Sequence, residues 1–504
     1  MPRPLLYEIH TRAWLQAWSA QLGRPVRLGE VPDHEFARWR DLGFTHIWMM
    51  GMWKTSEASR QLYLRLPGTA AFLNKTFPGW NPAGVPGSAF AIAGYQVPEP
   101  MGGDAGLERL RAQLHAHGLR LILDYIPNHV GLDHPWVRNH PERFVGAPAS
   151  SPVPSQEFFR ADTLTGPRWL AHGKDPWFPA WVDTVQLDYR RADTREAMGA
   201  ELRSVAERCD GVRCDMAMLL LQDVFARTWH KCPQPDSAPK EFWPEAINAV
   251  RRPGFLFLAE AYWELEERLQ ELGFDYVYDK RVTDCLMQQD AVELQRLLRR
   301  RSAEFLKRST HFLENHDEPR AAGRLSPFEH RAAAWAILAL PGMPLLHEGQ
   351  LSGAKTHASV HLNIRVAEES DLEIARMYEA FLAAIRNTAL KNGDGLVLSP
   401  LSPPGSKDVS ERTLVVAWRG AEGNWALAIA NPSSTAGQCA VELPRLHPSA
   451  RSWTVLRDRL SPEKTPDAWC HGSRVLLDVP AYAAQLLEVG VRDDGSVAEP
   501  ELGR

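Results

Sequence analysis

The 504-residue sequence contains no apolar run long enough to cross a membrane. Its longest apolar stretch, residues 332–346 (AAAWAILALPGMPLL), is too short and is interrupted by prolines. The N-terminal segment MPRPLLYEIHTRAW carries Glu8, His10 and Arg12, and so lacks the continuous apolar core of a signal peptide. We therefore expect no membrane partner.

Cysteines are few, and their spacing indicates neither a metal site nor a disulfide framework. Cys214 lies inside an expected buried strand, where a thiol packs as a small apolar group. Together with the missing signal segment, these features favour a cytoplasmic location. The six cysteines are Cys209, Cys214, Cys232, Cys285, Cys439 and Cys470.

Neither sign of charge dominates, because 57 Lys and Arg residues stand against 62 Asp and Glu residues, for a net charge of −5. This balance argues against nucleic acid or an anionic membrane surface as the main partner. Tryptophan, in contrast, is abundant, with 18 residues. Each Trp is most simply a core residue, but an indole face is also a flat platform on which a sugar ring stacks.

Strand-like runs alternate with helical segments between residue 5 and about residue 350, a pattern typical of a parallel sheet. Helical spacing of apolar residues precedes several runs, at 33–42, 106–118 and 194–209. The eight runs are residues 5–14, 43–53, 119–130, 211–217, 255–263, 274–280, 309–320 and 342–350. Eight such units predict an α/β fold, a (β/α)₈ TIM barrel with its catalytic groups at the C-terminal ends of the strands.

Two regions interrupt this alternation. Residues 131–182 follow the third strand and are too long for an ordinary loop, so we expect a short inserted subdomain there. From about residue 395 the chain changes to short alternating strands separated by turns, which predicts a C-terminal antiparallel β-sandwich. The expected domains are a barrel formed by residues 1–130 and 183–392, the insertion at 131–182, and the sandwich at 393–504.

Four of the apolar runs end on charged side chains. A charge at the end of a buried strand is unfavourable unless it lies at the open mouth of the barrel and acts there. The runs are ILDYIPNHV (122–130), GVRCDMA (211–217), FLAEAYW (257–263) and FLENHDEPR (312–320). They supply three acids, Asp215, Glu260 and Asp317, and such a set indicates a glycosidase.

A retaining glycosidase needs one ionised carboxylate as nucleophile and one protonated carboxyl as acid, about 5–5.5 Å apart. Arg213 precedes Asp215 by two residues on the same strand, so both face one side and the cation favours the ionised form of Asp215. Glu260 ends an apolar run, and burial favours the protonated form that an acid requires. The simpler alternatives are a structural ion pair for Asp215 and a surface position for Glu260.

Asp317 is the third acid, suited to binding sugar hydroxyls and to favouring a distorted ring. His129 and His316 each follow an Asn at a strand end, where a ring nitrogen can donate to a sugar hydroxyl. A single histidine would more simply be a structural residue. The recurrence of Asn-His at two strand ends favours a functional role for both histidines.

These segments resemble the conserved motifs of the α-amylase family of glycoside hydrolases, over roughly residues 5–390. DYIPNHV is similar to the first motif, GVRCDMA to the second, LAEAYW to the third and Asn315-His316-Asp317 to the fourth. PGMPLLHEG (341–349) resembles the eighth-strand signature, and SAFAIAGYQVPEPMGG (88–103) resembles the substrate-stacking loop after the second strand.

The resemblance implies that the α-configuration is retained, with Asp215 as nucleophile, Glu260 as acid/base and Asp317 as transition-state stabiliser. It also implies support of the first sugar subsite by four further residues, Asp124, His129, Arg213 and His316.

The chain departs from the family pattern at two places. Phe90 stands where a Tyr platform is expected, which leaves Tyr95 as the second aromatic residue of that loop. After Asp215 the family's amylases often carry a Lys-His pair, whereas this chain has Met216-Ala217-Met218-Leu219. That segment offers no cation ligand and no sugar donor. We therefore expect no metal and no other cofactor, and a bound calcium stays an alternative that this segment does not support. Met216 is either a packing residue or a specificity element.

The leading hypothesis is a retaining hydrolase of α-1,4-glucans or maltodextrins that forms a covalent glycosyl-enzyme intermediate. The main alternative is a transglycosylase that passes the glucosyl or maltosyl unit to a sugar. A non-catalytic sugar-binding scaffold is the third, disfavoured because none of the three acids is missing. The expected partner in each case is an oligosaccharide or α-glucan, and the sequence does not indicate the oligomeric state.

Overall fold

The computed structural model describes residues 3–492, apart from 152, 154–155, 233–239, 358, 405–406, 421–423, 444–451, 462, 464–467 and 472. Its strands include a closed parallel barrel in the order β1-β15-β14-β13-β12-β11-β5-β2. This confirms the predicted (β/α)₈ fold. The barrel strands are β1 (Leu6–His10), β2 (His46–Met50), β5 (Arg120–Tyr125), β11 (Gly211–Cys214), β12 (Leu256–Ala259), β13 (Tyr276–Tyr278), β14 (Ser309–Phe312) and β15 (Met343–His347).

The strands are shorter than the predicted runs. The run at 5–14 is the clearest case, because β1 ends at His10 and helix α1 (Thr11–Leu22) begins at the next residue. The His10 ring caps this helix by accepting a hydrogen bond from the Ala13 backbone N–H at 3.4 Å. The expected helices are present as α2 (Asp33–Leu42), α5 (Gly103–Ala116) and α7 (Ala192–Glu207).

The chain divides into two compact units. One comprises residues 6–278 and 356–368, and the other comprises residues 1–5, 279–355 and 369–504. Strands β14 and β15 therefore belong to the second unit and the other barrel strands to the first. Among the described residues, no helix combines the length and apolarity that a membrane crossing requires.

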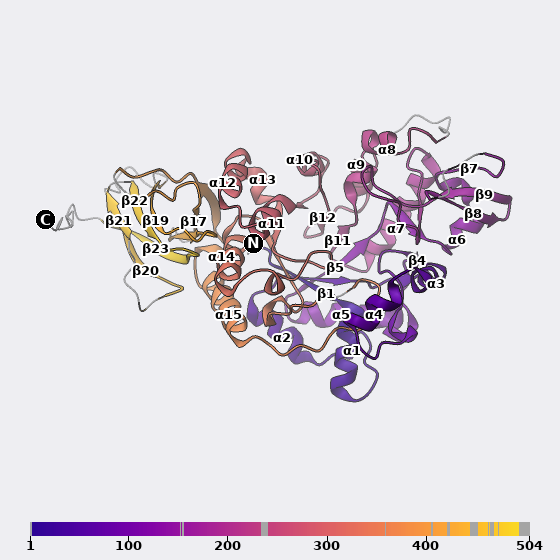
Figure 1. Ribbon diagram of the computed structural model, residues 1–504, viewed down its shortest axis with the longest axis horizontal. Coiled ribbons are helices and arrows are strands. Elements are labelled where there is room, and N and C mark those ends of the chain that lie inside the picture. The colour runs from indigo at the N-terminus through magenta and orange to yellow at the C-terminus, as the bar shows by residue number, and fades with distance from the viewer. Residues whose placement is uncertain are drawn as a thin grey trace. The chain divides into compact units, whose positions relative to one another are not determined.

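The insertion after the third barrel strand is built from short antiparallel strands of the first unit. Strand β6 (His129–Gly131) pairs with β10 (Thr184–Gln186), so the segment leaves and rejoins the barrel through one two-stranded ladder. Between them, β7 (Gly146–Pro148), β9 (Gly166–Ala171) and β8 (Phe158–Thr163) form a three-stranded sheet close to helix α6 (Pro135–Asn139) (Figure 1).

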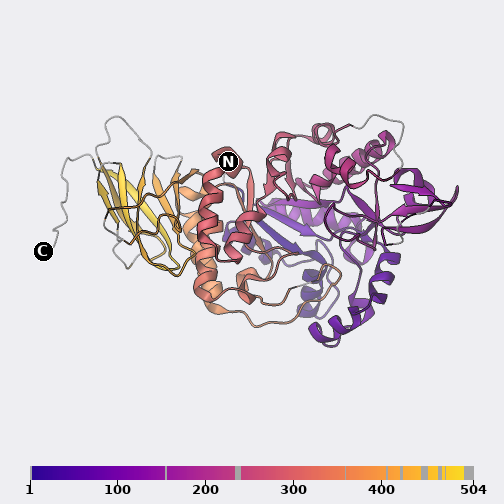
Figure 2. The ribbon, with the colours of Figure 1, turned by 45° about the horizontal axis from the view of Figure 1, so that its top comes forward.

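The C-terminal region consists of two antiparallel sheets of the second unit (Figure 2). Val415, Leu427, Val441 and Leu477 come from both sheets and pack in one buried cluster, which confirms the predicted sandwich. One sheet contains β16 (Asp394–Leu398), β17 (Leu414–Arg419), β18 (Trp425–Ala430), β23 (Ala484–Arg492) and β20 (Ser452–Asp458); the other contains β19 (Gly437–Glu442), β22 (Arg474–Val479) and β21 (Ala468–His471).

Helix α14 (Pro327–Ala339), also of the second unit, accounts for most of the longest apolar stretch. Its N-terminus carries a capping box, in which the Ser326 side chain accepts from the Glu329 N–H and the Glu329 side chain accepts from the Ser326 N–H. The central residues from Ala332 to Ala339 are all buried. The apolar run is therefore a core helix.

Candidate active site

The register of three neighbouring strands places the predicted site residues at one edge of the barrel. Arg213 on β11 lies opposite Asp124 on β5 and Leu258 on β12. The ladder continues past the strand ends, because the Asp215 N–H donates to the Tyr125 carbonyl at 2.9 Å and the Glu260 N–H donates to the Cys214 carbonyl at 3.0 Å. Parallel strands that end together thus present their last side chains side by side.

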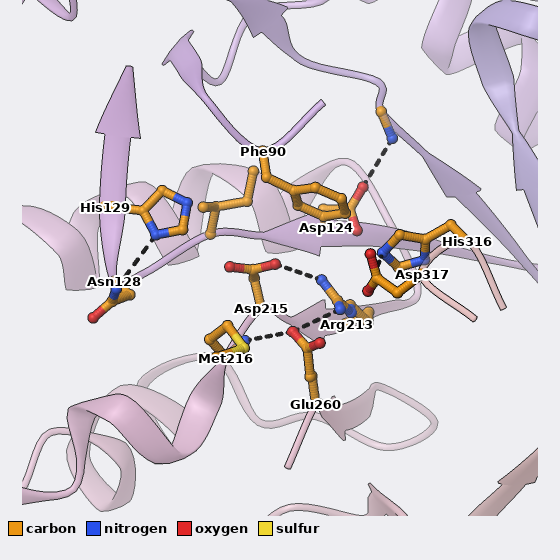
Figure 3. A network of polar contacts seen from close by, with 12 residues as sticks. Phe90, Asp124, Asn128, His129, Arg213, Asp215, Met216, Glu260, His316 and Asp317 are labelled. Carbon is orange, nitrogen blue, oxygen red and sulfur yellow. Dashed lines mark hydrogen bonds and ion pairs between the residues drawn. The ribbon is translucent and has the colours of Figure 1, made fainter. Parts of the chain in front are cut away.

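Arg213 binds both predicted catalytic acids (Figure 3). Its Nη1 donates to Asp215 Oδ1 at 2.8 Å, and its Nη2 lies 2.7 Å from Glu260 Oε2. Because both nitrogens belong to one planar guanidinium, the two carboxylates lie at a single site. Two acids pointing into separate cavities would have excluded a glycosidase.

The Arg213 guanidinium is fully buried and remains charged. Burial alone would lower its pKa, but electrostatic interactions with Glu260, Tyr278, Asp215 and Asp124 raise the pKa well above its ordinary value. Three aromatic rings surround it at 5.1 to 5.8 Å from their centroids, those of Trp48, Phe90 and Tyr278. The cation is therefore a permanent part of the site.

Glu260 accepts two further hydrogen bonds. The Met216 backbone N–H donates to Oε2 at 2.7 Å, and the Tyr262 hydroxyl donates to Oε1 at 2.8 Å. Met216 reaches this position with φ at 43°, a left-handed conformation that is uncommon for a residue with a side chain. Such strain is often found at functional sites, and here it directs a backbone donor at Glu260.

The segment after Asp215, where the chain lacks the family's Lys-His pair, is apolar and buried. The short 3₁₀ helix η4 (Ala217–Leu220) has all four residues buried, and Trp243 Nε1 donates to the Ala217 carbonyl at 2.9 Å. In the described part of the chain, acidic, His and Cys side chains do not form a group of three or more that could hold a metal ion. The expectation of no cofactor stays a prediction.

Asp124 is completely buried and accepts a hydrogen bond at each oxygen. Trp48 Nε1 donates to Oδ1 at 2.9 Å, and the Gly51 N–H donates to Oδ2 at 3.0 Å. Trp53 Nε1 also donates to its backbone carbonyl at 2.7 Å. These bonds tie the end of β5 to strand β2 and to the loop that follows it. A contact between Asp124 and substrate stays a prediction.

His129 begins β6, where its ring is buried. Its Nδ1 lies 3.3 Å from the Asn128 amide, and its ring centroid lies 5.2 Å from that of Trp181. Burial lowers the pKa of His129 to about 4, against smaller opposing effects of Asp183 and Glu260. At neutral pH the ring is therefore uncharged and can donate from only one nitrogen.

The two aromatic residues of the predicted stacking loop lie in different surroundings. Phe90 is half-buried, and its ring lies against the guanidinium of Arg213, the residue that binds both acids. Tyr95 is buried, and its hydroxyl both donates to the Ile126 carbonyl at 3.0 Å and accepts from the Ile126 N–H at 2.9 Å. These bonds give Tyr95 a structural role at the end of β5, and substrate stacking on it stays a prediction.

His316 and Asp317 follow β14 in the other unit. His316 Nε2 lies 3.0 Å from Asp317 Oδ2; the histidine side chain is 1% exposed and the aspartate side chain 48% exposed. The Asn315 side chain holds the turn by accepting from the N–H groups of Asp317 and Glu318 at 2.9 and 3.0 Å. The predicted meeting of Asp317 with Asp215 and Glu260 stays a prediction.

Three contacts of the site were not foreseen from the sequence: those of Trp48, Tyr278 and the Met216 backbone. Tyr278 Oη lies 3.4 Å from Arg213 Nε. Trp48 and Tyr278 belong to the predicted runs 43–53 and 274–280, where an aromatic residue is most simply core packing. The available signal was their position near the C-terminal end of a barrel strand.

The family assignment rests on sequence as well as on fold. The family model described as "Alpha amylase, catalytic domain" matches residues 39–387. That match covers more than half of the chain and includes the motifs that contain Asp124, Asp215, Glu260 and Asp317. The chain belongs to the α-amylase family.

Individual relatives are distant. "Alpha-amylase MalA" of Haloarcula japonica is 24% identical over 270 residues, which is 52% of this chain and 36% of that protein. "Alpha-1,4-glucan:maltose-1-phosphate maltosyltransferase" of Pseudomonas aeruginosa is 27% identical over 205 residues, 39% of this chain and 26% of that protein. The chain thus spans well under half the length of both relatives.

Among solved structures, the "noncanonic maltogenic alpha-amylase AmyB" of Thermotoga neapolitana superposes with a TM-score of 0.67 at 18% identity. The superposition covers 96% of this chain and 98% of that chain. At this identity the likeness establishes the common fold.

Proposed function

We propose that this protein is a retaining α-glycosidase that acts on α-1,4-glucans or maltodextrins through a covalent glycosyl-enzyme intermediate. The observation that supports the proposal most strongly is the pair of contacts from Arg213 to Asp215 and Glu260, at 2.8 and 2.7 Å. One buried cation holding two acids keeps them close together, as a retaining mechanism needs.

In the first step, an Asp215 carboxylate oxygen attacks the anomeric carbon and forms a C–O bond to it. The glycosidic C–O bond breaks, and Glu260 transfers its proton to the departing oxygen. In the second step, Glu260 removes a proton from a water molecule, whose oxygen attacks the same carbon and releases Asp215. Two inversions give net retention.

The surroundings of Glu260 set a condition on this role. Arg213, Met216 N–H and Tyr262 Oη all contact its oxygens, and such contacts favour a charged carboxylate. An acid must carry a proton when substrate is bound. We expect substrate binding to displace one donor. The Tyr262 hydroxyl is the best candidate, because it is on a half-buried side chain, whereas Arg213 is fully buried and Met216 donates from its backbone.

Phe90 supplies an aromatic face beside the two acids, and an uncharged His129 supplies a hydrogen-bond donor for a sugar hydroxyl. Asp317, held by His316, acts as the transition-state stabiliser. Its exposed carboxylate can accept hydrogen bonds from sugar hydroxyls that strengthen as the ring flattens.

A transglycosylase of the same family is the second candidate. The apolar, buried segment from Ala217 to Leu220 offers few side chains to bind a water molecule near the intermediate. A relative named as a maltosyltransferase is consistent with transfer. The two outcomes differ only in whether water or a sugar hydroxyl attacks the glycosyl-enzyme.

Two measurements test the proposal. A slow fluorinated α-glucosyl substrate should label the wild type with one covalent sugar on the peptide containing Asp215, whereas Asp215→Asn should show no label and no turnover. Label on another residue would refute the nucleophile assignment. Incubation with maltoheptaose then separates the two candidates, because products longer than seven units require transfer and only shorter products indicate hydrolysis.

A further inference from the structure

A cavity of about 620 Å³ lies in the first unit, apart from the Arg213 cluster. It is bounded by helix α1, by strand β3 (Lys54–Thr55), by the 3₁₀ turn η2 (Glu99–Met101) and by Asn363. Neither the three acids nor the other predicted site residues line it. Its volume is in the range of small-molecule sites.

A buried arginine forms part of its wall. Arg12 is 8% exposed, and its Nη2 donates to the Trp53 carbonyl at 2.5 Å. Its Nη1 is buried without a hydrogen-bond partner among the described residues, where Arg12 also forms no ion pair. Burial lowers the pKa of Arg12 to about 10. A buried cation without an acid is unfavourable, so a bound anion would stabilise it.

The rest of the lining combines apolar residues with a second cation and a few polar groups. Lys54 is exposed at the rim, so the lining contains two cations, and it contains no carboxylate. Asn363 Oδ1 is buried without a donor among the described residues, which adds an unsatisfied acceptor to the unsatisfied donor of Arg12. Gln16 and Thr55 add polar atoms. Four prolines give the wall a rigid backbone, namely Pro25, Pro86, Pro98 and Pro100.

We propose that this cavity binds a small anionic sugar derivative, whose phosphate or carboxylate group contacts Arg12 and Lys54 while a hydroxyl donates to Asn363 Oδ1. An anionic oxygen forms a charge-assisted bond with a guanidinium and satisfies Arg12. A neutral sugar would supply the hydroxyl but leave the cations unmatched. This site is separate from the one that cuts the glycosidic bond.

The test is calorimetric titration of the 504-residue chain with four probes. Glucose 6-phosphate and gluconate represent the two anionic sources, inorganic phosphate the anion alone, and glucose the neutral sugar. We expect one equivalent of glucose 6-phosphate or gluconate to bind, at least tenfold more tightly than glucose, and the tighter of the two identifies the anionic group. Inorganic phosphate should bind more weakly than the preferred sugar derivative, because it lacks the hydroxyl that reaches Asn363.

Two variants locate the binding. Arg12→Gln should weaken the preferred probe at least tenfold, and Lys54→Gln, at an exposed position that tolerates substitution, about fivefold. Arg65→Gln, an exposed arginine outside the lining, is the matched control and should bind as the wild type. Circular dichroism checks the fold of each variant. Equal affinity of wild type and Lys54→Gln, or no binding of either anionic probe, would overturn the proposal.

Discussion

Replacing Arg213 by Lys tests whether one guanidinium holds the two acids in place. Lys keeps the charge but loses the planar fork, so it can retain only one of the contacts at 2.8 and 2.7 Å. A hydrogen bond to a charged group contributes about 1.5–3 kcal/mol, so we expect the free energy of unfolding to fall by about that amount. Arg213→Met removes the charge, and leaving buried acids without their cation should lower it by about 3–5 kcal/mol.

The effect on catalysis should exceed the effect on stability. Displacing one acid by about 1 Å costs roughly 10²-fold in rate, so kcat/KM of Arg213→Lys should fall by at least that factor. Unfolding in urea, followed by tryptophan fluorescence, gives the first quantity, and initial rates on maltodextrin give the second.

The matched control is Arg160→Lys, at an exposed position of β8. Its free energy of unfolding and its kcat/KM should both stay at the wild-type values. Our interpretation of the site is wrong if Arg213→Lys has the free energy of unfolding of the wild type and a kcat/KM within twofold of the wild-type value.

Four further predictions concern single substitutions in the first unit. Burial lowers the pKa of His129 to about 4, below the ~6.5 of an unfolded histidine. The stability that the neutral ring contributes is therefore complete above pH ~6.5 and is lost as the pH falls to about 4. In urea unfolding at a series of pH values, His129→Gln should reduce this acid-induced loss of stability by up to ~3 kcal/mol. Gly211→Ala should destabilise by about 1–3 kcal/mol, because an added Cβ would lie 2.6 Å from the Leu256 carbonyl. Gly199→Ala in α7, where the nearest atom to an added Cβ is the flexible end of an arginine at 3.8 Å, should stabilise the protein by about 0.5–1 kcal/mol. A loss of stability as large as that of Gly211→Ala would contradict the packing argument. Glu260→Gln should slow substrates with poor leaving groups far more than activated aryl glycosides, and equal slowing of both would count against the acid/base assignment.

The barrel could be predicted because its signal is repeated along the chain. Each βα unit contributes one apolar run and one helical segment, and the runs found from residue 43 onwards coincide with barrel strands. The prediction was wrong at residues 11–14, where the chain continues as helix α1. A β-strand and a buried helix start can share one apolar composition, so a short run does not distinguish them. The β16 and β21 strands at the margins of the sandwich were not foreseen.

Local order along the chain indicates which residues are candidates for chemistry. Arg213 and Asp215 are two positions apart on one strand, so their common face follows from strand geometry alone. The acids at the ends of the runs likewise became candidates, because a charge after a buried strand needs an open end of the sheet. Family membership also follows from these segments, since the motifs are contiguous in sequence.

Contacts between distant segments were decided only by the fold. Glu260 shares Arg213 with Asp215 because β11 and β12 are neighbours in a fixed register, and Tyr278 reaches the same cation from β13. The Met216 N–H meets Glu260 only because the backbone turns into a left-handed conformation after Asp215. Arg12 and Asn363 line one cavity although they are 351 positions apart in the sequence. Register and side-chain packing depend on the whole chain at once, and no local pattern contains them.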